Sequence, residues 1–264
     1  MKKEILKKGM KYSKERLIDC MGIIILLLVW EMAPRLGLVD RQFFPPFSQV
    51  LLFLGKLAVS GVLFIHIAAS LQRIFLGLAL AVIIAVPVGI VLEGLFPALS
   101  RNLLRLFRLL EQVNALPLSL IFILFFGIGE LVKVFIIFWS TIWPILFTTI
   151  AGVRHVDPLY INMARSLGAS KLEIFKKVIL PAAAPTIFTG IRSGATYAFF
   201  ILIAAESMGA YYGVGRLIRS STFGAVIVIA LLGMSLNYLF HIIESNLLDW
   251  KKSLGDNDSE AAGG

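Results

Sequence analysis

Long stretches without a formal charge divide this chain and limit what it can fold into. Residues 74–92, 112–129, 134–153 and 220–243 form unbroken runs of nineteen, eighteen, twenty and twenty-four such residues, and 182–205 contains only Arg192. A helix that crosses a bilayer needs about 20 predominantly apolar residues. We therefore expect five membrane-spanning helices at these positions.

A sixth candidate, 17–33, is apolar in its centre and carries Asp19 and Glu31 near its ends. A basic start followed by a short apolar stretch also occurs in signal peptides, but no small-residue cleavage site follows before Pro34. We expect this segment to be retained as the first of about six transmembrane helices.

The composition excludes most soluble classes of protein. Hydrophobic residues make up 58% of the 264, charged residues only 16%, and the mean hydropathy is +0.88. Soluble domains carry about 25% charged residues. The single cysteine, Cys20, cannot form an intramolecular disulfide, and three histidines are too few for a Cys/His metal site. The expected fold class is an all-α polytopic membrane protein without a metal or cofactor.

The basic residues indicate how the chain is oriented. Seventeen Lys and Arg fall in 1–16, 94–110, 154–181 and the tail, whereas six fall in the opposite connections. Because cytoplasmic loops carry the excess of Lys and Arg, both termini are expected in the cytoplasm. The net charge of +9 then reflects topology and membrane lipid and does not indicate a nucleic-acid partner. We expect a basic segment over 1–16, one transmembrane domain over 17–252 and a disordered tail over 253–264.

The inner connection 154–181 has the pattern of a helical hairpin. Asp157-Pro158 is a helix start, Leu159, Met163 and Leu167 share one face, and Gly168 ends this first helix. Ser170 and Glu173 form a capping box for a second helix that we expect to end at Pro181. Such a basic, amphipathic hairpin can lie on anionic lipid or dock on a protein, and the spacing leaves both interpretations open.

A few polar side chains lie within or beside the predicted spans, where exposure to lipid is costly. These candidates for a transport pathway are Glu111, Asn114, Ser119, Arg192, Thr196 and Glu206. Each has a structural alternative. Ser and Thr often bond to their own helix, Arg192 could extend toward the cytoplasmic interface, and Glu206 could pair with Arg216 or Arg219.

The hairpin resembles the cytoplasmic signature of ABC-importer permeases, in which Glu-Ala-Ala is followed after three residues by Gly and after nine more by Ile-x-Leu-Pro. The matching positions here are Asn162, Met163, Ala164, Gly168, Val178, Leu180 and Pro181. Asn162 and Met163 depart from the signature, while Gly168 and Leu180-Pro181 keep its spacing. Segments 126–130, 151–158, 164–170, 180–183 and 205–210 are similar to the branch that handles nitrate, aliphatic sulfonates and taurine.

This resemblance implies the type I ABC importer permease fold in a bacterial inner membrane. Two copies of the permease would form a homodimer around the pathway, two cytoplasmic ATPase subunits would bind ATP and Mg²⁺, and an extracytoplasmic binding protein would deliver a small anionic or zwitterionic solute. The ATPase-coupling loop would use Asn162, Met163, Ala164, Leu167, Gly168, Leu172, Phe175, Leu180 and Pro181. The chain itself has no G-x-x-x-x-G-K-[ST] motif, so ATP hydrolysis is expected from the partner.

One alternative from another class is a proton-coupled secondary transporter in which Glu111 or Glu206 carries the proton. A transporter of that kind would not explain the basic hairpin over 154–181.

Overall fold

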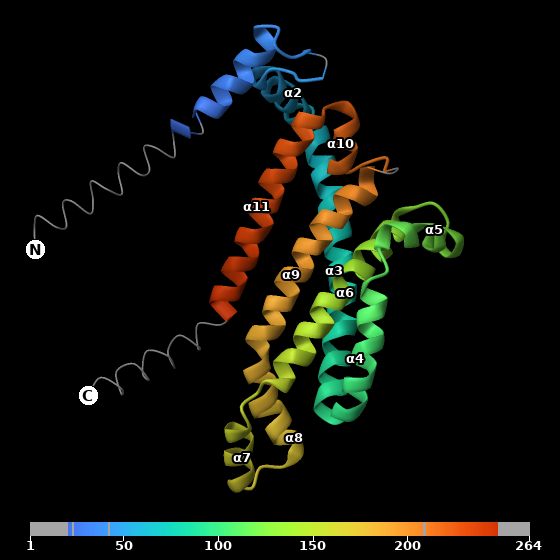
Figure 1. Cartoon of the computed structure of the whole chain (residues 1–264), viewed down its shortest axis with the longest axis vertical. Helices are drawn as coiled ribbons and strands as arrows, with labels where there is room; N and C mark the ends of the chain where they lie inside the picture. Colours follow the sequence, from blue (N-terminus) through green and yellow to red (C-terminus); the bar gives the residue numbers. More distant parts are fainter. Residues whose placement is uncertain (1–20, 23, 42, 208–209, 248–264) are drawn as a thin grey trace, which may run out of the picture. The chain divides into compact units, whose positions relative to one another are not determined.

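The computed structural model describes residues 21–22, 24–41, 43–207 and 210–247, and all regular secondary structure in these ranges is helical (Figure 1). After a helical stretch over 24–35, the elements are α2 (Phe47–Val59), α3 (Val62–Leu95), α4 (Pro97–Glu111), α5 (Ala115–Phe126), α6 (Glu130–Arg154), α7 (Pro158–Ser166), α8 (Lys171–Ile174), the π-helical turn η1 (Phe175–Ile179), α9 (Leu180–Ser207), α10 (Val214–Ser220) and α11 (Thr222–Leu247). The expected segments 1–16 and 253–264, and residues 17–20 of the first helix, lie outside the described residues.

The chain divides into two compact units, one formed by residues 1–64 with 221–224 and the other by 65–220 with 225–264. In the first unit, Trp30 donates its indole N–H to the Pro45 carbonyl over 3.1 Å and packs against Phe44, Phe47 and Phe223. Glu31 accepts hydrogen bonds from the backbone N–H and the hydroxyl of Ser48, which ties the first helix to the start of α2.

Within the described residues, four helices are long and apolar enough to cross a membrane: Val62–Leu95, Glu130–Arg154, Lys171–Ser207 and Thr222–Phe240. The expected all-α polytopic class is confirmed. The expected start of the second span at residue 74 is wrong, because α3 begins at Val62 and continues through Arg73. The charge of Arg73 suggested the edge of the span. Arg73 instead lies inside the helix, and only 4% of the residue is exposed.

The expected span over 112–129 is helical only from Ala115 to Phe126, and the expected connection before it is helical as well. The chain forms α4 and α5, which meet at a 90° bend. Asn114 adopts an extended conformation at the break, and its side chain accepts a hydrogen bond from the Leu116 N–H at the start of α5. An Asn in this position satisfies a backbone donor that a new helix leaves without a partner. Charge could not indicate this helix boundary, because Asn114 is uncharged and lies within the uncharged run 112–129.

The bent pair crosses from one end of the second unit to the other. Arg73, in the first half of α3, contacts Glu130 at the start of α6, while Glu93 near the end of α3 contacts Arg154 at the end of α6. The helices α3 and α6 therefore run parallel. Because parallel neighbours need a connection that returns to the starting side, α4 and α5 together act as one broken span.

The helix α6 packs closely against α3 and α9, and glycines make this approach possible. A Cβ atom added at Gly77 or Gly89 of α3 would lie within 3 Å of Ile137 or Thr149 of α6. On α9, a Cβ at Gly190 would lie 1.7 Å from the Thr148 hydroxyl oxygen and 2.8 Å from its Cβ. Small residues are the usual means by which helices approach each other in membranes.

We predict that Gly190→Ala lowers the thermal stability of the protein. Rotating the Thr148 hydroxyl would not remove the 2.8 Å contact with its Cβ, so α6 and α9 would have to separate. Overpacking of this kind costs about 1–3 kcal/mol. The measurement is the unfolding midpoint in detergent, followed by tryptophan fluorescence. Gly55→Ala on α2 is the matched control, because nothing lies within 4 Å of that Cβ position. Equal midpoints for the two variants would contradict this account of the packing.

Candidate functional site

The first helix of the hairpin forms and ends as its sequence predicts. The Asp157 side chain accepts a hydrogen bond from the Leu159 N–H over 2.8 Å, and Pro158 occupies the first helical position of α7. At the other end, Gly168 has φ +80°, and the N–H groups of Gly168 and Ala169 donate to the carbonyls of Arg165 and Ala164. This pair of bonds is the Schellman motif, which requires a left-handed residue at the Gly168 position.

The second helix begins as expected but does not end at Pro181. Ser170 and Glu173 form the predicted capping box at the start of α8. The chain then passes through η1 directly into α9, so that Lys171–Ser207 is one helix of 37 residues. The wider π turn precedes Pro181, whose ring would clash with the Lys177 carbonyl in a regular α-helix and which has no N–H to donate. The second helix of the hairpin is thus continuous with a membrane-spanning helix.

One face of the hairpin is anchored to the spans. Ile161 of α7 and Ile179 of η1 pack on the cluster formed by Val153, Val156, Ala183 and Ile187. Phe175 was expected on the docking surface but packs against Gly94 of α3 instead. A Cβ atom added at Gly94 would lie only 2.6 Å from the Phe175 ring. Where the hairpin joins the spans, Arg154 donates two hydrogen bonds to the Glu93 carboxylate over 2.8 and 2.9 Å. This bidentate pair joins the ends of α3 and α6 that carry the hairpin.

The opposite face presents large apolar side chains. At least 57% of each is exposed, and the exposed fraction of Leu167 reaches 87%. We call this set the hairpin patch: Leu159, Tyr160, Met163, Leu167 and Leu172. Of the other predicted coupling residues, Asn162 is exposed, Ala164 is half-buried, and Leu180-Pro181 lie in the first turn of α9.

The structure places the predicted pathway residues at three separate positions. Glu111 and Asn114 lie at the bend between α4 and α5, and Ser119 is buried on α5. Arg192 and Thr196 line a groove between α9 and α11. Glu206 is buried near the end of α9. The six residues therefore do not form a single site.

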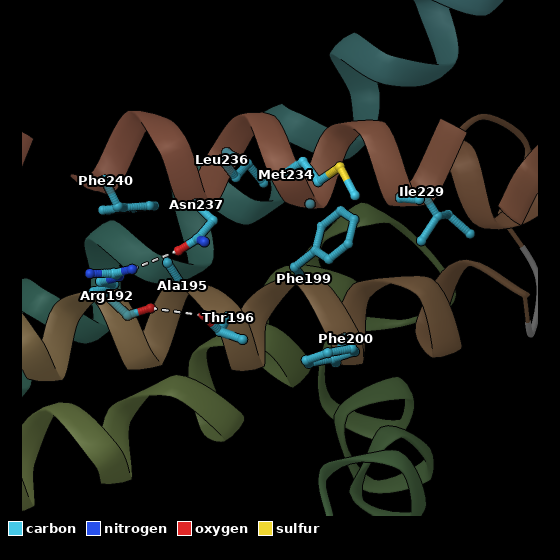
Figure 2. A pocket seen from close by; sticks show the side chains of 12 residues that line it. Arg192, Ala195, Thr196, Phe199, Phe200, Ile229, Met234, Leu236, Asn237 and Phe240 are labelled. Carbon is cyan, nitrogen blue, oxygen red and sulfur yellow. Dashed lines mark hydrogen bonds between the residues drawn. The ribbon is translucent and has the colours of Figure 1, made fainter. Parts of the chain in front are cut away.

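The groove between α9 and α11 holds the second of these groups, Arg192 and Thr196 (Figure 2). It has a volume of about 470 Å³ and is lined mainly by apolar side chains, among them Phe199, Met234 and Phe240. Arg192 donates a hydrogen bond to the Asn237 side-chain oxygen over 3.0 Å, and the two side chains point toward one another across the groove. The Thr196 hydroxyl donates to the Arg192 carbonyl, which is the intrahelical bond expected of a Thr in a span.

Glu206 belongs to a buried polar cluster that sequence reasoning missed. Only 1% of Glu206 is exposed, and its carboxylate accepts hydrogen bonds from the Ser70 hydroxyl, the Arg73 guanidinium and the Gly215 N–H. The expected pairing with Arg216 is wrong, because Arg216 donates to the Ala210 carbonyl. The side chain of Arg219 is outside the described residues. The usable signal was Arg73 itself, since a cation within a span needs an acidic partner.

The same cluster ties together the connections at this end of the second unit. Arg73 also pairs with Glu130, which Lys133 contacts over 2.7 Å, and donates to the Tyr212 carbonyl over 2.8 Å. The N–H groups of Gly213 and Val214 donate to His66 and Ser70. The glycine-rich turn over 211–215 therefore closes over Glu206. This arrangement is typical of a structural role. Among the residues that the structure describes, no group of three or more acidic, His or Cys side chains could hold a metal ion.

Comparison with known proteins agrees with this architecture. A model of the family described as "Binding-protein-dependent transport system inner membrane component" matches residues 85–248. The taurine transport system permease protein TauC of Escherichia coli (strain K12) is 33% identical over 251 residues, covering 90% of this chain and 91% of TauC. The putative aliphatic sulfonates transport permease protein SsuC of Bacillus subtilis (strain 168) is 31% identical, covering 87% of this chain and 86% of SsuC.

A solved structure extends the likeness to the fold. An inward-facing structure of the MetNI methionine ABC transporter aligns with a TM-score of 0.62 and 17% identity, covering 71% of this chain and 95% of the MetNI chain. The resemblance inferred from the hairpin signature is confirmed. Because the family match covers more than half of the sequence, the chain belongs to the family of binding-protein-dependent transport system inner membrane components.

Proposed function

We propose that this chain is the permease subunit of an ATP-driven importer and that its hairpin patch docks on a cytoplasmic ATPase subunit. The observation that carries the proposal is the pair of opposite faces on the hairpin. Ile161 and Ile179 fasten one face to the spans. The other face exposes Leu159, Met163 and Leu167, a contiguous apolar surface of the kind that marks an interaction site.

The continuous helix from Lys171 to Ser207 supports a mechanical role for this contact. A load on the hairpin patch reaches α9 in two ways: Leu172 lies on the continuous helix itself, and Ile161 packs α7 on the cluster that includes Ala183 and Ile187 of α9. Because α9 packs on α6 through Gly190 and Gly194, the two spans then move together. In this mechanism, ATP binding and hydrolysis in the partner shift the permease between inward-open and outward-open arrangements.

The solute is a small anion or zwitterion. The names of TauC and SsuC give taurine and aliphatic sulfonates as the compounds that those systems transport, and both compounds carry a sulfonate group. The transport assembly consists of a permease homodimer, two ATPase subunits that bind ATP and Mg²⁺, and an extracytoplasmic binding protein. It lies in a bacterial inner membrane with both permease termini in the cytoplasm.

The first test changes the turn of the hairpin. Valine at position 168 is strained at φ +80° by about 1–2 kcal/mol, so Gly168→Val should displace α7 from α8. We expect this variant to insert and dimerise but to lose its association with the ATPase subunit, measured by copurification from membranes. Insertion is spared because the turn lies outside the spans.

Two matched variants make this test specific. Gly168→Asn should retain most of the association, because Asn adopts the left-handed conformation more readily than other residues. Leu159→Ala removes one apolar side chain from the patch without changing the turn, and its effect should be milder. Normal ATPase association and coupled transport by Gly168→Val would instead favour a hairpin that rests on lipid.

The energy source separates the proposal from a proton-coupled transporter. We expect uptake of labelled taurine into proteoliposomes containing the whole complex to continue in the presence of a protonophore. Uptake should stop when the ATPase subunit loses its nucleotide site. The opposite pair of results would support proton coupling through Glu111 or Glu206, although Glu206 is fully engaged with Ser70 and Arg73.

A reporter fused after Trp250 tests the orientation. With the α4–α5 pair counted as one crossing between the ends of the parallel helices α3 and α6, the described residues give five crossings, and the expected first helix would make six. An even number places both ends on the same side, and the Lys/Arg distribution makes that side the cytoplasm. We expect a C-terminal phosphatase fusion to be inactive and a fluorescent fusion to be bright. An active phosphatase fusion would contradict a cytoplasmic C-terminus and, with it, a cytoplasmic hairpin.

A further inference from the structure

We propose that three arginines of α4 line the inner half of the translocation pathway and attract the anionic solute there. We call this set the arginine stripe: Arg101, Arg105 and Arg108. The inference rests on the proposed import of a sulfonate-bearing solute and adds a defined wall of the pathway to that function. The sequence predicts residues 94–110 as an inner connection, whereas the structure places the stripe on one half of the broken span.

The first argument is the direction of α4, which lies beside α6 and runs antiparallel to it. Near the start of α4, Ser100 donates a hydrogen bond to Glu93, the carboxylate that Arg154 contacts from the end of α6. Beyond the end of α4, the Val113 carbonyl accepts a hydrogen bond from the indole of Trp139, in the first half of α6. The helix α4 therefore extends into the membrane along α6 and does not lie flat on the membrane surface.

The second argument is the depth of Arg108. This residue lies about 12 Å beyond Ser100 along α4, within the inner half of a hydrocarbon core about 30 Å thick. Its guanidinium carbon is 5.2 Å from the centroid of the Phe147 ring. Phe147 is itself about 10 Å from Arg154 along α6. The charge of Arg108 therefore stays at the depth of Phe147 and does not extend to the cytoplasmic interface.

The third argument is that α4 has two separate exposed faces. The members of the arginine stripe are four and three residues apart, so they share one face of the helix. Another face carries leucines of which at least 48% is exposed: Leu99, Leu106 and Leu109. Leu104 and Phe107 pack on the core cluster around Trp143. Lipid chains can cover the leucine face, but arginines inside a membrane normally face protein or a water-filled cavity.

The fourth argument is that the charges of the stripe are not neutralised within the chain. All three arginines are exposed, and none of them forms a salt bridge with another residue that the structure describes. Arg101 interacts electrostatically with Glu93, but Arg154 already holds that carboxylate by two hydrogen bonds. The contact of Arg108 with Phe147 leaves its positive charge in place. A cationic wall of this kind concentrates anions and favours their passage.

A labelling experiment tests whether water reaches the stripe, whatever the solute is. Arg108→Cys and Leu106→Cys are made in a Cys20→Ser background, since Cys20 is the single native cysteine. Inside-out vesicles that contain the whole complex are treated without ATP with 2-sulfonatoethyl methanethiosulfonate, an anionic reagent that does not cross membranes. We expect Arg108→Cys to react at least about tenfold faster, because only the thiolate reacts and an apolar environment suppresses it. Equal rates for the two variants would overturn the inference.

A transport experiment tests the attraction of an anion. Uptake is measured in proteoliposomes that contain the permease, the ATPase subunit and the binding protein, with methanesulfonate and taurine as probes. The double variant Arg105→Gln/Arg108→Gln should lower methanesulfonate uptake about tenfold. Taurine uptake should fall less, because taurine has no net charge near neutral pH. Arg105→Lys/Arg108→Lys keeps both charges and should retain most of the uptake. Lys56→Gln is the matched control, because it removes a cation from α2, in the other compact unit.

The two experiments distinguish a failure of this inference from a failure of the proposed solute class. If the unaltered complex imports neither probe, the solute class is wrong, and the labelling rates by themselves support or overturn a water-facing stripe. Unchanged methanesulfonate uptake by the double Gln variant would overturn the inference. An equal loss for both probes, or no rescue by the double Lys variant, would indicate a structural role and would also overturn it. A selective loss of methanesulfonate uptake with rescue by Lys would support it.

Discussion

The close packing of α6 against α3 and α9 is the constraint on which the rest of the second unit depends. Apolar helices in a bilayer gain little from leaving lipid for each other, so their association depends on van der Waals contact at short range. Gly77 and Gly89 allow α3 to approach α6, and Gly190 and Gly194 do the same for α9. This three-helix core keeps the ends of α3 and α6 side by side next to the hairpin. It also holds α9 against α6.

Two buried or half-buried arginines lie in different environments. Arg73 pairs with Glu130 and Glu206 and also donates to a backbone carbonyl, so its charge serves to join α3, α6, α9 and the turn before α10. Removing one member of such a buried set leaves an uncompensated charge, which is strongly destabilising. Arg192 instead donates to the neutral amide of Asn237 beside an open groove. The first arrangement is typical of a structural lock, whereas the second lines a groove.

The two ends of the hairpin differ in how well the sequence predicts them. Its caps follow from neighbouring residues, but its continuation into α9 does not. Its caps and its left-handed Gly168 depend on residues within a few positions of each other, and the structure has them as predicted. The continuity of α8, η1 and α9 was not predicted, because Pro181 is normally a sign that a helix has ended. The π turn accommodates the proline and lets the second hairpin helix continue into the span. Likewise, Phe175 shares the apolar pattern of the patch, yet its ring packs against Gly94 of α3.

The sequence by itself determined the class of fold, the approximate positions of most spans, the hairpin and the family, since each depends on composition or on residues close together in the chain. It did not reveal the bend at Asn114 or the helical course through Arg73, because charge was the boundary signal and the true boundaries do not follow charge. Only the tertiary structure decided which polar groups meet. Arg73 and Glu206 are 133 residues apart, and Arg192 and Asn237 are 45 apart. Their pairing depends on which faces of separate helices turn toward each other, a choice set by packing around α6 that no local pattern encodes.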